Sequence, residues 1–144
     1  MKYQLEANKG KFFDKVFVFP IRIYYEDTDA GGIVYYANYL RFAERVRTEY
    51  LRCLGCSQQN VLEEEKCGFT VRKCEIEYLR PALFDDELIV TCEMREIKGA
   101  SAIMYQEVYR EDELLATINV KVAYVNLTKK RPTRIPENLI DKIA

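Results

Sequence analysis

The stretch YYEDTDAGGIVYYANYL, Tyr24 to Leu40, marks the point at which the apolar residues of this chain change their period. Before it, VFVFPIRIYY (16–25) carries apolar residues at alternate positions, which predicts a strand, with Pro20 at a sheet edge or a bulge. After it, residues 37–54 carry apolar residues at steps of three and four, which predicts an amphipathic helix. The stretch therefore joins a strand to the one long helix that the sequence predicts.

The expected helix has a well-defined apolar stripe and recognisable ends. The stripe consists of Tyr39, Phe42, Ala43, Val46, Tyr50 and Leu54. Gly55 follows directly and suits a left-handed residue after the last turn, while Asn38 is a candidate cap at the start. At a rise of 1.5 Å per residue the helix would be roughly 25 Å long, enough to cross a small sheet. A second, shorter helix is expected in SQQNVLEEEKCG, from Ser57.

From Phe69 onward, short links such as IKGAS and REDE separate segments of alternating apolar residues. Such links form hairpins, so the sheet is expected to be mostly antiparallel, with about five to six strands. One helix covers only one face of a sheet. The predicted fold class is therefore α+β, a curved antiparallel sheet wrapped around one long helix, within a single domain over 1–144. Its uncovered face and free edges indicate a homo-oligomer.

Composition excludes several classes of function. The chain has no histidine, which excludes Ser-His and Cys-His nucleophiles and histidine-based metal sites within one chain. Its net charge of -1 gives no general attraction for nucleic acid. No apolar run reaches the roughly 20 residues of a transmembrane helix, and MKYQLEANKGKFF lacks the apolar core of a secretory signal. A cytoplasmic location with reduced thiols is the resulting expectation.

Three local patterns allow more than one interpretation. Cys53-x-x-Cys56 follows a helix and lacks further zinc ligands at suitable spacing, so ordinary thiols are expected there. The basic segment TKKRPTR (128–134) is either a solvated loop or a clamp for an anionic phosphate group. Asp27 and Asp29 are either turn-forming residues or, beside a glycine turn and a helix start, a source of a nucleophile or general base.

The segment YYEDTDAGGIVYYANYLRFAERVRTEYLR resembles the signature of hotdog-fold acyl-CoA thioesterases, D-x-x-G-x-V-x-x-x-x-Y, beginning at Asp29. It is most similar to the Tol–Pal-associated branch, with the 4-hydroxybenzoyl-CoA thioesterases as relatives. The similarity continues through FTVRKCEIEYLRPALFDDEL and RPTRIPENL. It implies a hotdog fold that dimerises edge to edge and often forms tetramers, and an enzyme that hydrolyses acyl-CoA. Coenzyme A would then be part of the substrate, and no cofactor is expected.

The resemblance also implies roles for individual residues. Asp29 matches the catalytic carboxylate, and Tyr36 matches the position whose backbone N–H polarises the thioester carbonyl. Tyr36 stands where the Tol–Pal branch usually has histidine, which removes an imidazole but leaves the backbone donor. The implied substrate-binding residues are Gly68 near the acyl group and, for coenzyme A, Lys98, Ser101, Lys129, Lys130 and Arg131.

Two alternatives to an acyl-CoA hydrolase follow from the same resemblance. A hotdog hydroxyacyl dehydratase would use a histidine with a carboxylate, and this chain has no histidine. A non-catalytic hotdog module would bind acyl-CoA or act in an envelope-associated complex, and would bind its ligand without turnover. For the hydrolase itself, acyl carrier protein is an alternative donor of the acyl group.

Overall fold

The computed structural model describes residues 3–6, 8–55 and 66–143. Cys56 and the helix expected from Ser57 lie outside these residues. The described helices and strands, in chain order, are β1 (Lys11–Phe13), β2 (Val16–Arg22), the 3-10 helix η1 (Tyr25–Asp27), α1 (Asn38–Cys53), β3 (Cys67–Tyr78), β4 (Glu87–Lys98), β5 (Ser101–Arg110), β6 (Glu113–Asn126), β7 (Arg131–Pro132) and α3 (Glu137–Ile143).

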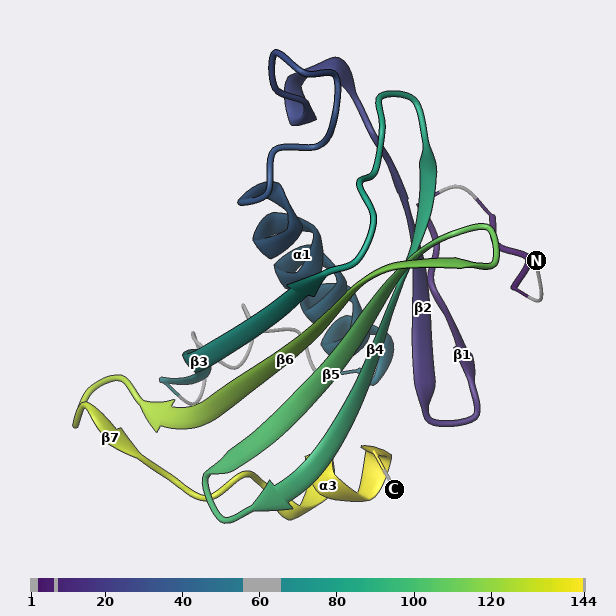
Figure 1. Cartoon of the computed structure of the whole chain (residues 1–144). Coiled ribbons are helices and arrows are strands. Elements are labelled where there is room, and N and C mark those ends of the chain that lie inside the picture. The colour runs from purple at the N-terminus through teal and green to yellow at the C-terminus, as the bar shows by residue number, and fades with distance from the viewer. Residues whose placement is uncertain (1–2, 7, 56–65, 144) are drawn as a thin grey trace.

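The described strands form one antiparallel sheet that curves around α1, so the expected α+β hotdog architecture is confirmed (Figure 1). The strand order is β1-β2-β4-β5-β6-β3, with β7 pairing β6. The sheet has seven strands where about five to six were expected. The difference lies in β1 and β7, which have 3 and 2 residues and are too short to show a period of two in the sequence.

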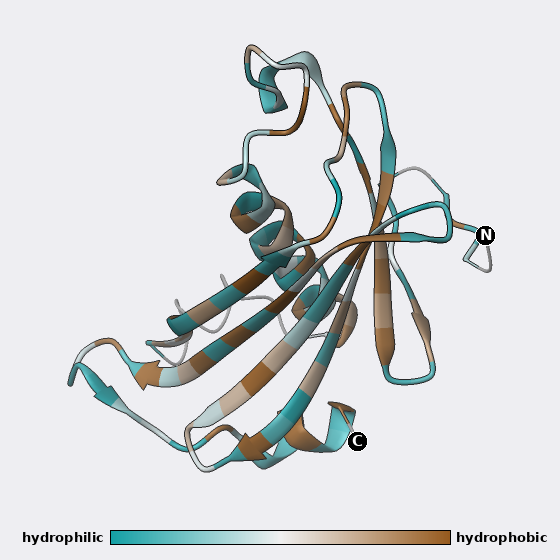
Figure 2. Ribbon diagram, viewed as in Figure 1, coloured by the Kyte–Doolittle hydropathy of each residue, from teal (hydrophilic) through white to brown (hydrophobic). Residues whose placement is uncertain are grey.

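The core lies between α1 and the concave face of the sheet. Figure 2 shows the apolar and polar bands alternating along the strands, as expected for a sheet with one buried face. Of the predicted stripe on α1, Tyr39, Phe42, Ala43, Val46 and Tyr50 are buried. Gln106 on β5 is completely buried among these apolar groups, and its Nε2 donates to the Ala43 carbonyl at 3.1 Å. This contact attaches the middle of α1 to the sheet through a satisfied polar group.

The two ends of α1 differ in how well the sequence predicted them. Gly55 has a φ of +81° and its N–H donates to the Arg52 carbonyl at 2.9 Å, so the left-handed glycine is confirmed. The prediction of Asn38 as the N-terminal cap is wrong, because Ala37 is the capping residue and has no side-chain acceptor. The Asn38 side chain instead donates from Nδ2 to the Asp27 carbonyl at 2.8 Å.

Strand β3 is an edge of the sheet and pairs only with β6 among the described strands. Its 12 residues form a long free edge, and Val71 and Tyr78 are about half exposed on it. At the opposite side of the sheet, Pro20 lies in β2 beyond the short stretch that β1 covers. A residue without an N–H therefore occupies an edge position, as predicted.

Candidate functional site

The turn that carries Asp29 is closed by its own backbone. Thr28 and Val34 form an isolated bridge, and the Asp29 N–H donates to the Ile33 carbonyl at 2.9 Å. Gly32 has a φ of +79°, the left-handed conformation that glycine adopts at low cost. At Gly31, a Cβ atom would lie 3.2 Å from Asp29 Oδ1. The first glycine therefore allows close approach of the carboxylate, and the second allows the turn.

The two aspartates of this segment have different environments. Asp27 Oδ2 accepts a hydrogen bond from the Tyr24 N–H at 2.8 Å, which caps η1, so Asp27 is a turn-forming residue. Asp29 Oδ1 accepts from the Gly31 N–H at 2.8 Å, and its side chain is exposed. Asp29 Oδ2 accepts no hydrogen bond from any described residue. One oxygen is thus held by the turn while the other remains available to a substrate.

The Asp29 turn and the start of α1 share one anchor, the carbonyl of Asp27. It accepts hydrogen bonds from the Tyr35 N–H at 3.0 Å and from Asn38 Nδ2 at 2.8 Å. Tyr36 lies between these two donors in the sequence, two residues before α1 begins at Asn38. Within the described part of the chain its N–H has no hydrogen-bond acceptor. A carboxylate and a free N–H at the positive end of a helix are therefore carried by one short, anchored loop.

Two tyrosine hydroxyls, one on β3 and one on α1 itself, attach the tip of α1 to the surrounding structure. The Tyr78 hydroxyl, from the end of β3, donates to the Tyr36 carbonyl at 3.0 Å. The Tyr39 hydroxyl accepts from the Ala82 N–H at 3.1 Å, and the rings of Tyr39 and Tyr78 meet edge-on at 5.2 Å. No pattern in the sequence indicates the role of Tyr78, because its partner is 42 residues away and the residues around it predict only a strand.

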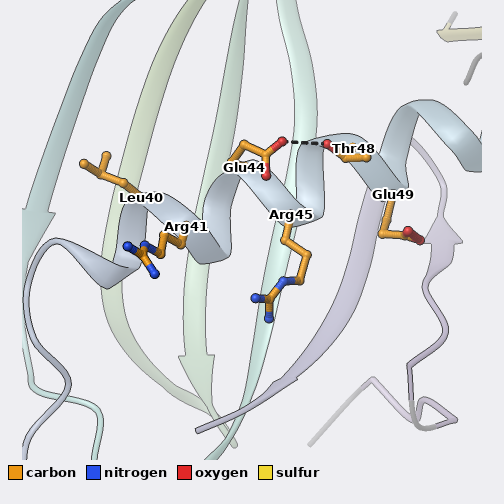
Figure 3. Close-up of a pocket in the computed structure, with 6 residues that line it drawn as sticks. All are labelled: Leu40, Arg41, Glu44, Arg45, Thr48 and Glu49. Carbon is orange, nitrogen blue, oxygen red and sulfur yellow. Dashed lines mark hydrogen bonds between the residues drawn. The ribbon is translucent and has the colours of Figure 1, made fainter. Parts of the chain in front are cut away.

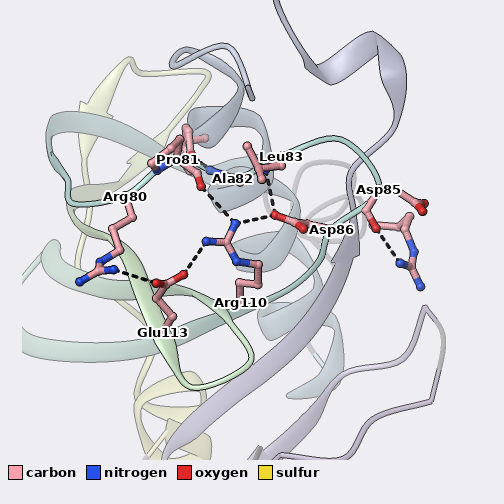
Figure 4. A network of polar contacts seen from close by, with 10 residues as sticks. Arg80, Pro81, Ala82, Leu83, Asp85, Asp86, Arg110 and Glu113 are labelled. Carbon is pink, nitrogen blue, oxygen red and sulfur yellow. Dashed lines mark hydrogen bonds and ion pairs between the residues drawn. The ribbon is translucent and has the colours of Figure 1, made fainter. Parts of the chain in front are cut away.

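The segment between β3 and β4 forms the wall beside the Asp29 turn. The Val34 N–H donates to the Ala82 carbonyl at 2.9 Å, and Ile33 bridges to Leu83. Figure 4 shows how the end of the β5–β6 hairpin holds this wall: Arg110 donates to the Pro81 carbonyl and to Asp86 Oδ2.

Arg110 also pairs with Glu113, which in turn pairs with Arg80 at 2.9 Å. The hydrogen bonds to Asp86 and Glu113 raise the pKa of Arg110, and the contact with Arg110 lowers the pKa of Glu113. Both shifts favour the charged forms of Arg110 and Glu113. Ion pairs therefore hold the wall of the candidate site in addition to its backbone hydrogen bonds.

The predicted substrate-binding residues lie at the other end of the sheet. Gly68 is buried near the start of β3, ten residues from Tyr78, which corresponds to about 33 Å along a strand. The basic residues Lys129, Lys130 and Arg131 are exposed at the β6–β7 turn. Figure 1 shows this turn and the tip of the β4–β5 hairpin far from the loop that precedes α1. A single chain therefore does not bring these residues to Asp29 and Tyr36.

Lys98 and Ser101 lie at the tip of the β4–β5 hairpin, where Ser101 Oγ donates to the Lys98 carbonyl at 3.2 Å. They line a surface pocket of about 440 Å³ together with Lys121. The neighbouring Ile135 N–H donates to the Gly99 carbonyl, so this hairpin lies beside the segment that follows β7. Two lysines, Lys98 and Lys121, thus line this pocket, which makes it a suitable place for an anionic group.

A hollow of about 520 Å³ on the outer face of α1 does not form part of the candidate site (Figure 3). It is lined by Leu40, Arg41, Glu44, Arg45, Thr48 and Glu49. Thr48 Oγ1 donates to Glu44 Oε1 at 2.9 Å, which is an ordinary contact between successive turns of a helix. The hollow receives no side chain from the Asp29 turn, and its alternating charges are typical of a solvated helix face.

Burial makes two of the described thiols, Cys74 and Cys92, poor candidates for nucleophiles. Burial raises the pKa of the Cys92 thiol far above its ordinary value, and burial also raises the pKa of Cys74. Cys67 is buried and Cys53 is exposed at the end of α1. The interpretation of Cys53-x-x-Cys56 as ordinary thiols stays a prediction, because Cys56 lies outside the described residues. The described residues contain no group of three metal-binding side chains. Nor do they include a helix of the length and apolarity needed to span a membrane.

Comparison with known families gives a match over most of the chain. Residues 24–143 match the model of the family described as the thioesterase-like superfamily. A curated relative, the acyl-CoA thioesterase YbgC of Haemophilus influenzae, is 48% identical over 126 residues, which cover 88% of this chain and 93% of the relative. The acyl-CoA thioesterase YbgC of Helicobacter pylori is 32% identical and covers 81% and 91% of the two chains.

Solved structures agree with this match. A crystal structure described as "Probable Thioesterase from Bartonella henselae" superimposes with a TM-score of 0.79 at 34% identity, over 83% of this chain and 98% of that chain. The 4-hydroxybenzoyl CoA thioesterase from Pseudomonas sp. strain CBS-3 superimposes with a TM-score of 0.84 at 21% identity, over 90% and 99%. At 21% identity, the similarity to the Pseudomonas structure establishes only that the two chains share a fold.

Proposed function

The chain belongs to the thioesterase-like superfamily and is a thioester hydrolase, and from this premise we propose that it hydrolyses acyl-CoA thioesters to the free acid and coenzyme A. The observation that supports the proposal is the anchored loop, which carries an exposed carboxylate at Asp29 and a free N–H at Tyr36. A carbonyl placed between them has a nucleophile or base on one side and an oxyanion donor on the other.

We assign Asp29 as the catalytic carboxylate, with two routes for the reaction. In the first, Asp29 Oδ2 attacks the carbonyl carbon, the C–S bond breaks, and water then hydrolyses the mixed anhydride. In the second, the carboxylate accepts a proton from a water molecule that attacks directly. Coenzyme A leaves as a thiolate in either route. Because a thiolate is a good leaving group, no histidine is required as a general acid, and the chain has none.

We assign the stabilisation of negative charge on the tetrahedral oxygen to the Tyr36 N–H and the positive end of α1. Backbone donors of this kind lower the barrier by about 3 kcal/mol in other enzymes. Tyr36 contributes its N–H rather than its side chain, so the ring at this position is free to vary without loss of the donor. The hydroxyacyl dehydratase alternative lacks its histidine in this chain.

The decisive variant is Asp29→Asn, because asparagine keeps the acceptor oxygen for the Gly31 N–H and removes only the charge. We expect kcat for acyl-CoA hydrolysis to fall by about 100-fold or more, with little change in stability, since the nucleophile or base is lost. Release of free thiol measures the rate, and thermal unfolding checks the fold. Turnover near the wild-type rate would reduce Asp29 to a turn-forming residue and contradict the assignment.

A panel of short, long and aromatic acyl-CoA thioesters, with acyl carrier protein as a second donor, defines the substrate. Hydrolysis of at least one acyl-CoA well above background is the expected result. Rates at background throughout, combined with tight binding, would instead support a non-catalytic acyl-CoA-binding module.

We further propose that a second copy of the chain completes the site. If two β3 edges pair antiparallel about a twofold axis, the Gly68 end of one strand meets the Tyr78 end of the other. Gly68 then approaches the acyl group, and the basic residues Lys129, Lys130 and Arg131 anchor the phosphates of coenzyme A for the neighbouring copy. The long free edge of β3 and its half-exposed apolar side chains support this arrangement.

The proposal includes an oligomer of two or four copies, with residues 1–144 of each acting as one hotdog domain in the cytoplasm. An association with the Tol–Pal system, which the family resemblance implies, stays a prediction. So does a contribution of Lys98 and Ser101 to coenzyme A binding, which their pocket beside Lys121 supports.

A further inference from the structure

The carbonyl of Tyr36 receives a hydrogen bond from a strand that is remote in the sequence. Tyr78 closes β3, where it pairs with Ala116 on β6, so its backbone is fixed by the sheet. Its hydroxyl donates to the Tyr36 carbonyl at 3.0 Å, whereas the Tyr39 N–H reaches the same oxygen only at 3.4 Å. The contact from Tyr78 is the better hydrogen bond by distance. It attaches the turn before α1 to the edge of the sheet.

This hydrogen bond acts on the peptide group that joins Tyr36 to Ala37. The peptide is trans, so its C=O and its N–H point in opposite directions. A donor that holds the Tyr36 oxygen therefore also fixes the direction of the Ala37 N–H. Neither this N–H nor that of Tyr36 donates to an acceptor in the described segments. A hydrogen bond to the carbonyl further polarises the peptide and strengthens its N–H as a donor.

The surroundings of Tyr78 keep its hydroxyl in place and protonated. Its ring meets Tyr39 edge-on at 5.2 Å and Tyr36 at 6.3 Å, so two aromatic contacts define its orientation. Desolvation raises the pKa of Tyr78, with smaller contributions from the neighbouring Tyr39, Cys74 and Tyr36. The phenol therefore remains a hydrogen-bond donor throughout the neutral range. The side chain is nevertheless 45% exposed, so it lies at the rim of the site and not in the core.

We propose that Tyr78 is a positioning residue for the oxyanion donors: its hydrogen bond to the Tyr36 carbonyl orients the Ala37 N–H directly and holds the turn that carries the Tyr36 N–H. The proposal rests on the proposed function, because it takes these N–H groups as the donors to the thioester oxygen. Tyr78 itself does not touch the reacting atoms in this assignment. Its effect should appear in the stabilisation of the transition state and not in substrate binding.

The test compares Tyr78→Phe with Tyr35→Phe, two removals of a hydroxyl close to the same turn. Phenylalanine at residue 78 keeps the ring contacts and deletes only the donor. The Tyr35 hydroxyl donates no hydrogen bond to a described residue and serves as the matched control. We expect Tyr78→Phe to lower kcat by about tenfold with little change in KM, because small displacements of a positioned donor are costly. Tyr35→Phe should keep the wild-type kcat.

A second readout does not depend on turnover. Amide hydrogen exchange and the ¹H–¹⁵N shifts of Tyr36 and Ala37 are measured by NMR in the free protein. Both should change in Tyr78→Phe and not in Tyr35→Phe. Unchanged kcat in Tyr78→Phe, in an enzyme that loses activity in Asp29→Asn, would overturn the role of Tyr78 alone. Absence of thioester hydrolysis in the wild type would overturn the proposed function and this role together, and unchanged amides would overturn the positioning itself.

Discussion

Gly31 and Gly32 are adjacent in the turn beside Asp29, but glycine suits the two positions for different physical reasons. Gly32 has a left-handed φ of +79° and open space where a Cβ would be. Gly31 does not have a left-handed φ, but a Cβ there would lie 3.2 Å from Asp29 Oδ1. Backbone conformation therefore favours glycine at residue 32, and proximity to the Asp29 carboxylate favours it at residue 31.

This difference predicts that two alanine substitutions affect different properties, one the activity and the other the stability. Gly31→Ala should push the Asp29 carboxylate aside and lower kcat by about tenfold, with little loss of stability. Gly32→Ala should cost about 1 kcal/mol of the free energy of unfolding, because alanine is strained in the left-handed region. Free-thiol release and urea unfolding measure the two quantities. A Gly31→Ala enzyme with full activity would show that the carboxylate does not need its present position.

At the scale of elements, the candidate site depends on segments that α1 and the strands hold in place. The wall of residues 80–86 contacts the Asp29 turn through Val34 and Ile33, and Arg110 on β5 holds this wall through Asp86. The side chains of Arg110 and Asp86 are 27% and 18% exposed. Solvent screens this ion pair less than the surface pair of Arg22 and Glu87, whose side chains are 49% and 55% exposed.

Two substitutions of arginine test this difference in burial. Arg110→Met should lower the free energy of unfolding by about 1–3 kcal/mol, because it leaves the partly buried carboxylate of Asp86 with only the hydrogen bond from the Leu83 N–H. The matched control Arg22→Met should cost less than about 1 kcal/mol, as for other exposed pairs. Denaturant unfolding of both variants decides the comparison. Equal losses would mean that the Arg110 network does not hold the wall more firmly than a surface contact.

At the scale of the whole molecule, the two groups of predicted site residues lie at opposite ends of one sheet. Asp29 and Tyr36 precede α1, whereas Gly68 and the basic residues lie near the β6–β7 turn (Figure 1). Within one chain this separation leaves the carboxylate without a basic clamp for coenzyme A. Antiparallel pairing of two β3 edges removes the separation, because it places opposite ends of two sheets side by side.

Mixing two inactive variants tests this shared site. One carries Asp29→Asn, and the other carries alanine at Lys129, Lys130 and Arg131. If each site takes its carboxylate and its basic residues from different copies, a mixed dimer contains one fully wild-type site. Activity at low acyl-CoA concentration should therefore recover after the two proteins are unfolded and refolded together. Wild type mixed with Asp29→Asn gives the reference, and no recovery would contradict the shared site.

The sequence by itself determined the long helix and the long strands of this protein, whereas β1, β7 and α3 were not predicted. The change of period around residues 24–40 predicted the strand, the turn and the helix, and Gly55 marked the end of that helix. These predictions succeeded because backbone conformation depends mainly on neighbouring residues. The resemblance to a known family supplied Asp29 and Tyr36 as site residues, and their catalytic roles stay predictions.

Only the tertiary structure decided which distant residues meet. It showed that Asn38 contacts the Asp27 carbonyl instead of capping the helix, and that the hydroxyl of Tyr78 reaches Tyr36 across 42 positions. It also placed Gly68 at the far end of β3 from Tyr78. These contacts follow from strand register and from the path of the sheet around α1, which no local pattern of residues specifies.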